Sequence, residues 1–274
     1  MTASTEHPLR PEHLAGCLAL SAAANWNQND ADWRLMLSLG YGWGISQDGR
    51  LVASTLVLPY DTFAWISMVL VLPEQRRKGY ASRLLSTAIA NLRSRGLTPI
   101  LDATPAGREV YRQAGFHDTW SFSRFFCRPE NRGGAKRRAV SHKETWSVPD
   151  LYLDRAAFGA DRSAVLHALQ ERLPHAASGG RNGFVLGRDG KEANQLGPLV
   201  AGDEGTALAL LEHAVDAVGA PLYVDVVDHA PKLQGWLQSH GFGIQRPFTR
   251  MVHGGSRAPG DESLVYLVAG PELG

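Results

Sequence analysis

Three basic residues followed by a glycine, Arg76-Arg77-Lys78-Gly79, have the types and spacing that could hold a phosphate group. They follow an apolar run that ends at Pro73 and precede an Ala- and Leu-rich segment with helical periodicity. Free backbone N–H groups in the first turn of a helix point toward a bound anion, and the helix dipole favours its negative charge. Basic residues at such a turn are often only solvated, so their charge alone is weak support for a site.

The segments around this turn alternate between helical and strand-like patterns. Glycines and polar turns such as Asp48-Gly49 separate them. Helices are expected over 11–24, from about 30, over 80–95 and over 106–113, and strands over 41–46, 51–58, up to 72, over 99–103 and through 120–126. The predicted order is therefore α-α-β-β-β-α-β-α-β.

The motif Arg76-x-x-Gly79-x-Ala81 after an apolar strand resembles the acetyl-CoA pyrophosphate loop of the GNAT superfamily of N-acetyltransferases, whose pattern is Gln/Arg-x-x-Gly-x-Gly/Ala. The predicted order of elements over about residues 10–127 is that of a GNAT domain without its optional first strand. The resemblance implies an α/β (α+β) fold, in which a mixed, mostly antiparallel sheet is flanked by helices.

The second half of the chain is a divergent copy of the first. A shift of 126 positions places Gly79 on Gly205, Gly115-Phe116 on Gly241-Phe242, and Phe122-Ser123-Arg124 on Phe248-Thr249-Arg250, whereas Asp102 matches Asp225 at an offset of 123. Self-similarity on both sides of a compensated gap predicts two tandem domains of one fold. We assign a catalytic GNAT domain to 1–128, a basic polar linker to 129–147 and a degenerate GNAT-like domain to 148–274.

The two copies differ at the loop that would hold a phosphate. Arg76-Arg77-Lys78 becomes Gly202-Asp203-Glu204, which would repel a pyrophosphate. We therefore expect one nucleotide site. The short spacing between Asp189-Gly190 and Gly202 further predicts that the second copy has lost a strand.

Further segments extend the resemblance to nearly the whole chain, toward a bacterial tandem-GNAT family with a degenerate C-terminal domain. They are Trp26-Asn27-Gln28, 101–107, 153–162 and 269–274. The basic stretch 132–138 fits a solvated linker better than a nucleic-acid-binding or regulatory tail.

The resemblance assigns the cofactor, acetyl-CoA, to the first half. The strand that ends at Leu72 would pair with the pantetheine arm and splay from its neighbour at a bulge. The expected cofactor-binding residues are Val69, Leu70, Val71, Arg76, Arg77, Lys78, Gly79, Tyr80, Ala81, Ser82, Thr104 and Gly107. Thr104 stands where the family often has Asn, so this contact departs from the pattern.

Tyr111 occupies the family's tyrosine position ahead of Gly115-Phe116 and is the candidate acid. A phenol with a pKa of about 10 can protonate a thiolate whose acid has a pKa of about 8.5. The alternative is a packing tyrosine whose hydroxyl reaches solvent. No base is identifiable, since Asp61 and His117 are better explained as surface residues.

Aromatic and amide side chains in the first half are candidates for acceptor binding. Trp26, Asn27 and Gln28 would border the acceptor groove of a GNAT fold, whereas Trp33, Trp43 and Trp65 are expected to pack in the core. In the second half, Asp225, Asp228 and His229 are interpreted as polar loop residues, and no metal site is expected.

Composition sets the remaining bounds. The 274 residues are 44% hydrophobic and 20% charged, with 28 basic and 27 acidic side chains, so nothing favours nucleic acid or a membrane as partner. The two cysteines are too few for a disulfide framework and indicate a reducing compartment. No signal peptide or membrane span is recognisable, so we expect a cytoplasmic protein, for which a homodimer is left open.

Together these features predict an acetyl-CoA-dependent N-acetyltransferase that moves an acetyl group to a primary amine by direct attack, with the second domain shaping the acceptor site. The acceptor is a small-molecule or peptide amine that the sequence does not identify. Two alternatives remain open at this point: a non-catalytic acyl-CoA-binding or sensing protein, and a transferase of a longer acyl group.

Overall fold

The computed structural model describes residues 4–128, 130, 150–180 and 182–274. The expected linker, 129–147, lies outside these residues except for Glu130. None of the described helices combines the length and apolar character needed to cross a membrane.

The first half has the predicted order of helices and strands, with one strand added at its start. That strand, β1 (Ser4–Pro8), pairs antiparallel with the next one, so the expectation that it is absent is wrong. Its sequence, Ser-Thr-Glu-His-Pro, has no alternating apolar pattern, because an edge strand buries little surface. The other elements are α1 (Leu14–Ala23), α2 (Asp30–Leu39), β2 (Tyr41–Gln47), β3 (Arg50–Pro59), β4 (Phe63–Val71), α3 (Tyr80–Ser94), β5 (Thr98–Ala103), α4 (Pro105–Gln113) and β6 (Phe116–Cys127).

The second half repeats this order. The strand that we expected to be lost is present as the three-residue β7, which pairs with β8 as β2 pairs with β3. The elements are α5 (Leu151–Phe158), α6 (Ser163–Arg172), β7 (Ser178–Gly180), β8 (Gly183–Arg188), β9 (Asn194–Ala201), α7 (Glu204–Val218), β10 (Leu222–Val227), α8 (Pro231–Ser239), β11 (Gly243–His253) and β12 (Val265–Leu267).

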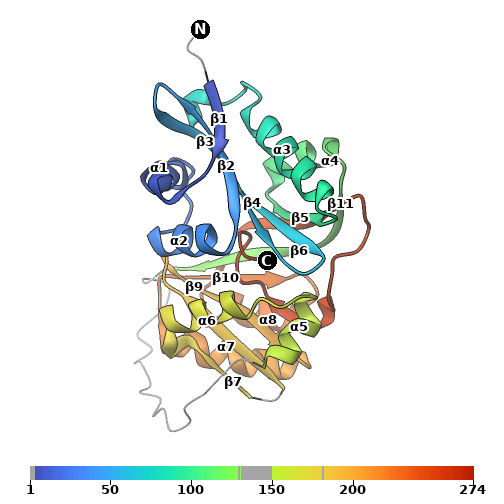
Figure 1. The fold of residues 1–274 in the computed structure, drawn as a ribbon. Coiled ribbons are helices and arrows are strands. Elements are labelled where there is room, and N and C mark those ends of the chain that lie inside the picture. Colours follow the sequence, from blue (N-terminus) through green and yellow to red (C-terminus); the bar gives the residue numbers. More distant parts are fainter. Residues whose placement is uncertain (1–3, 129, 131–149, 181) are drawn as a thin grey trace.

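The described strands form one continuous sheet in the order β1-β2-β3-β4-β5-β11-β6-β10-β12-β9-β8-β7. β11, from the second half, lies between β5 and β6, and β6, from the first half, lies between β11 and β10. Figure 1 shows β6 and β11 crossing the middle of the molecule. The two halves have thus exchanged their last long strands.

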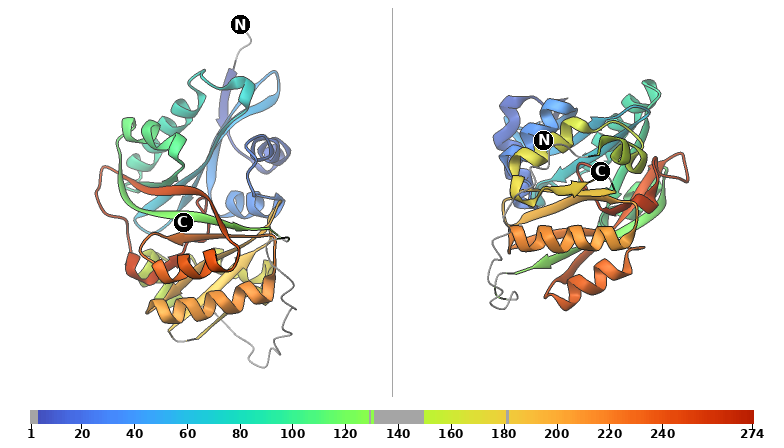
Figure 2. Two further views of the ribbon diagram at one scale, coloured as in Figure 1. Left: turned by 180° about the vertical axis from the view of Figure 1, so that it is seen from behind. Right: turned by 90° about the horizontal axis from the view of Figure 1, so that it is seen from below.

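Helices cover both faces of the sheet in each half. In Figure 1, α1 and α2 lie on one side of the upper part and α3 and α4 on the other. Seen from below in Figure 2, α5 and α6 lie across the sheet from α7 and α8. Trp33 of α2 and Leu84 of α3, for example, pack against the strands with no exposed surface. The halves meet along the middle of the sheet, where β11 pairs with β5 and β6, and β6 pairs with β10.

Two reciprocal ion pairs fasten the exchanged strands. Arg124 of β6 donates to Asp225 of β10 at 2.7 and 2.6 Å, and Arg250 of β11 donates twice to Asp102 of β5 at 3.0 Å. In each pair the two residues are directly opposite in the strand register. The expectation that Asp225 is a polar loop residue is therefore wrong: it is a fully buried strand residue whose partner comes from the other half.

We predict that Asp225→Ala lowers the free energy of unfolding by about 3–5 kcal/mol, because it leaves the buried Arg124 guanidinium without its carboxylate. Asp61→Ala is the matched control, since Asp61 pairs with Arg155 across the halves with both side chains exposed, and should change stability by at most about 1 kcal/mol. Urea unfolding followed by circular dichroism measures both. Equal losses in the two variants would contradict the assigned role of the buried pair.

Candidate active site

A bulge in β4 opens the sheet next to the predicted cofactor loop. Met68 has φ of +51°, and the register with β3 shifts there, so that Met68 and Val69 together oppose Thr55. The parallel pairing of β4 with β5 ends at Trp65 and Ile100, whereas the other edge of β5 stays paired with β11 as far as Ala103. The two strands therefore diverge, as the resemblance implied, and the edge of β4 from Val69 onward faces a groove.

The loop after β4 leads directly into the first turn of α3. Gly79 adopts φ of +79° and is the N-cap of α3, with no side chain capping the helix. Open space surrounds the position where a Gly79 Cβ would stand, so the left-handed conformation is what calls for glycine. Lys78 donates to Gln75 at 2.7 Å, and Arg76, Arg77 and Lys78 are exposed. The first-turn N–H groups and three cations are thus available to an anion.

The groove runs from this loop to an inner chamber between the two halves. Its outer part is lined by Ala24, Trp26, Val69, Leu70, Val71, Arg76, Ala81, Leu85, Asp102, Thr104, Pro105, Ala106, Gly107, Val110, Tyr111 and Arg246. The chamber is lined by Trp26, Gln28, Ile66, Ser67, Met68, Val69, Leu101, Asp102, Thr104, Tyr111, Arg124, Arg246, Phe248, Pro271 and Glu272. Six residues belong to both parts, so the groove and the chamber are continuous.

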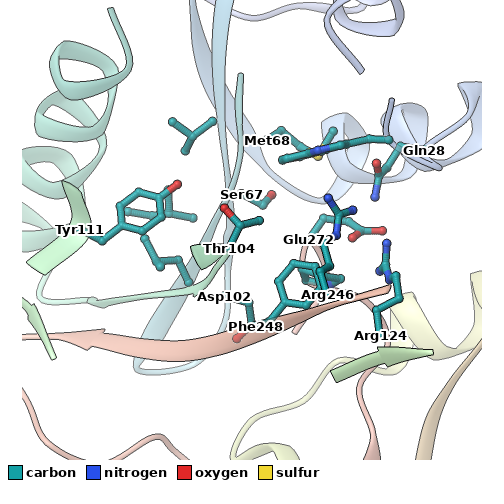
Figure 3. Close-up of a pocket in the computed structure, with 15 residues that line it drawn as sticks. Gln28, Ser67, Met68, Asp102, Thr104, Tyr111, Arg124, Arg246, Phe248 and Glu272 are labelled. Atoms are coloured by element: carbon teal, nitrogen blue, oxygen red, sulfur yellow. The ribbon is translucent and has the colours of Figure 1, made fainter. Parts of the chain in front are cut away.

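Tyr111 lies where the groove meets the chamber. Its ring packs edge-on against Phe116 and so closely on Gly107 that a Cβ there would come within 2.8 Å of it. Figure 3 shows its hydroxyl directed toward the chamber. Burial raises the pKa of Tyr111 to about 12, so the phenol is protonated at neutral pH and can donate a hydrogen bond or a proton.

The structure brings most of the sequence-predicted site residues to this groove. Val69, Leu70, Val71, Arg76, Ala81, Thr104, Gly107, Tyr111 and Trp26 line the groove, and Gln28 lines the chamber. Arg77, Lys78, Gly79, Tyr80 and Ser82 lie in the loop and the first turn of α3, beside it. Thr104 is the N-cap of α4, where its hydroxyl accepts from the Gly107 N–H at 3.3 Å.

Asn27 does not fit the predicted acceptor role. It is buried and absent from the groove lining. Its side-chain amide donates to the Ala193 carbonyl at 2.9 Å and accepts from the N–H groups of Glu192 and Ala193 at 2.9 and 3.1 Å. These bonds fix the α1–α2 connection to the β8–β9 turn, so Asn27 joins the halves instead of facing a substrate.

Several chamber residues come from the second half and were not predicted. Arg246 and Phe248 reach the chamber on β11, and Pro271 and Glu272 reach it on the segment after β12. The internal repeat, which matches Phe122 with Phe248, predicted that the two strands are equivalent but not that they are exchanged. The position of these side chains near Tyr111 could therefore not be predicted from the sequence.

The equivalent loop of the second half has different capping. Asp203 is the N-cap of α7 and accepts from the Thr206 hydroxyl at 2.7 Å and from the Thr206 N–H at 2.9 Å, and these hydrogen bonds lower the pKa of its carboxyl. The N-terminus of α7 is thus capped by a carboxylate, whereas the equivalent N-terminus of α3 has no capping side chain.

Comparison with known proteins agrees with this geometry. Residues 13–116 match the acetyltransferase (GNAT) family, and residues 151–267 match an acetyltransferase (GNAT) domain. The Bacillus subtilis (strain 168) protein named uncharacterized N-acetyltransferase YitH is 25% identical over 243 residues, which cover 85% of this chain and 86% of the relative.

Two solved structures show how widely the fold is shared. One proposed to be an acetyltransferase, from Pyrococcus horikoshii, has a TM-score of 0.82 at 19% identity, covering 100% of this chain and 97% of that one. A tandem GNAT protein from the clavulanic acid biosynthesis pathway has a TM-score of 0.63 at 16% identity, covering 94% and 100%. With both halves matched, the chain belongs to the GNAT superfamily, as an acyltransferase that carries two GNAT domains in tandem.

Proposed function

We propose that the protein is an acetyl-CoA-dependent N-acetyltransferase that uses one cofactor site, in the first half, and acetylates a primary amine held in the interdomain chamber. The observation that carries this is the continuous groove from an uncapped, basic helix end, past the splayed strand β4, to Tyr111 and the chamber. Each part of that groove would meet one requirement of acetyl transfer: the helix end would hold the cofactor, Tyr111 would serve as the acid, and the chamber would hold the amine.

The residues present fit the cofactor. The amides of the loop from Arg77 to Ala81 and the cations beside them would hold the pyrophosphate. The open edge of β4 at Val69–Val71 would pair with the pantetheine arm, as a neighbouring strand would. Acetyl-CoA supplies a thioester whose acyl carbon can be transferred.

Transfer would proceed by direct attack of the amine nitrogen. A C–N bond forms and the C–S bond breaks; of the two protons that the ammonium loses, one goes to solvent and one ends on the departing sulfur. Tyr111 would donate the proton to sulfur. An acyl-cysteine is not part of this scheme, because Cys17 and Cys127 are fully buried and lie outside the groove.

The second half would complete the acceptor site. It contributes Arg246, Phe248 and Glu272 to the chamber, while its own loop carries Asp203 at the helix end. A degenerate domain thus supplies the wall of a site whose cofactor lies in its neighbour.

Replacement of Arg76, Arg77 and Lys78 by Glu should raise the dissociation constant for acetyl-CoA by at least about 100-fold, since three attractive charges become repulsive at a helix N-terminus. Isothermal titration calorimetry measures this. Glu at three other exposed basic positions, Arg10, Lys191 and Arg257, makes the same change in net charge and should leave the constant nearly unaltered. Tight binding to the loop variant would refute the assignment of the cofactor site.

Tyr111→Phe should lower kcat about 100-fold while acetyl-CoA binding is retained, because only the proton donor is removed. Tyr152→Phe is the control, at a residue that is 90% exposed. Steady-state release of CoA, with an amine that the wild type accepts, reports kcat. A fall of less than about threefold would leave Tyr111 with a packing role only.

A further inference from the structure

Three buried polar atoms that border the chamber have no hydrogen-bond partner among the described residues: Gln28 Oε1, Ser67 Oγ and Arg246 Nε. Gln28 and Ser67 are 4% and 7% exposed. The three residues come from the α1–α2 connection, β4 and β11, so they converge from separate elements (Figure 3). Buried polar groups are normally paired, so this convergence points to a ligand that pairs them.

Arg246 also lacks a carboxylate partner within the described residues. Its neighbour Arg124 is paired with Asp225, and Arg246 itself lies over the ring of Phe248 at 5.2 Å. Burial lowers the pKa of Arg246, and the charge of Arg124 adds to that effect. The carboxylates of Asp225 and Glu272 oppose this lowering without making an ion pair with Arg246. A half-buried guanidinium, which stays charged at neutral pH, therefore faces the chamber with no carboxylate in direct contact among the described residues.

Glu272, which also lines the chamber, has the opposite imbalance. Its carboxylate and that of Asp32 both accept from the single guanidinium of Arg188, with each side chain at most 3% exposed. Arg172 also contacts Asp32 but is itself paired with Asp189. This cluster keeps one excess negative charge, and Glu272 is its member that lines the chamber.

We propose that the acceptor is a free amino acid bound as a zwitterion, with its carboxylate on Arg246 and its ammonium at Glu272. One cation and one anion that are not paired with each other match the two charges of such a substrate. Ser67 Oγ would donate to the carboxylate, and Gln28 Oε1 would accept from the ammonium. The apolar walls, Ile66, Met68, Leu101 and Phe248, favour an apolar side chain.

This inference rests on the proposed function and gives Glu272 a role in it. The carboxylate takes the first proton from the ammonium and passes it to solvent; the neutral nitrogen then attacks, and its second proton replaces the one that Tyr111 gives to sulfur. The products are an N-acetylamino acid and CoA. A peptide or protein N-terminus, which has no adjacent carboxylate, would leave Arg246 unpaired.

The test compares matched acceptors with acetyl-CoA present and measures CoA release. Each of the twenty amino acids is assayed beside its amide and its decarboxylated amine, for example leucine, leucinamide and 3-methylbutylamine. At least one amino acid should exceed both analogues by about 10- to 100-fold in kcat/KM, the range expected for losing charge-assisted hydrogen bonds. Equal or better turnover of the analogues for every amino acid overturns the inference and leaves the acetyltransferase intact.

Arg246→Gln separates the carboxylate contact from the rest. Through a higher KM for the amino acid, it should lower the ratio of kcat/KM for the amino acid to kcat/KM for its decarboxylated amine about 10- to 100-fold, and circular dichroism reports correct folding. Arg257→Gln, at an exposed position, is the matched control. An unchanged KM in Arg246→Gln contradicts the carboxylate assignment. Absence of CoA release with any amine overturns the proposed function, and this inference with it.

Discussion

The reciprocal pairs Arg124–Asp225 and Arg250–Asp102 are the constraint on which the rest of the structure depends. Arg124 and Arg250 are equivalent positions of the internal repeat, and so are Asp102 and Asp225. Each arginine reaches the aspartate of the other half, at the point where the exchanged strand pairs with its new neighbour. The same interaction is therefore made twice, as in a two-fold symmetric dimer, but within one chain.

The centre of this pseudo-symmetry lies between β6 and β11. Phe122 and Phe248, again equivalent positions, are opposite each other in the register and stack with ring centroids 5.0 Å apart and an interplanar angle of 10°. Exchange places β11 beside β5 at the point where β4 diverges from it. The strand that completes the first sheet thus comes from the second half and brings Arg246 to the groove beside β4. Under the proposed function, this arrangement would let a domain with an altered phosphate loop influence which amine the other domain acetylates.

Chamber electrostatics follow from the same geometry. A buried arginine is stabilised when its carboxylate is close, and Arg124, one of the two arginines that line the chamber, has such a partner in Asp225 of the opposite half. Arg246, the other, has no ion-pair partner among the described residues, and Glu272 shares one arginine with Asp32. A buried cation and anion that make no ion pair with each other are costly without a ligand and complementary with one. Selectivity would then arise between the domains, whereas cofactor binding would belong to one of them.

The sequence by itself determined the local features. Residue spacing and periodicity were enough to predict the loop at Arg76–Gly79, the position of Tyr111, the order of helices and strands, and the internal repeat. The first strand, β1, was not predicted because an edge strand needs no apolar pattern. Strand β7 was not predicted because three residues are too few to show an alternating pattern. Only the tertiary structure decided the strand exchange, the burial of Asp225, the structural role of Asn27 and the arrival of Arg246 and Glu272 at the site. Each of these depends on which residues meet across more than a hundred positions of chain, and pairing at that distance is fixed by packing and charge compensation in the folded state.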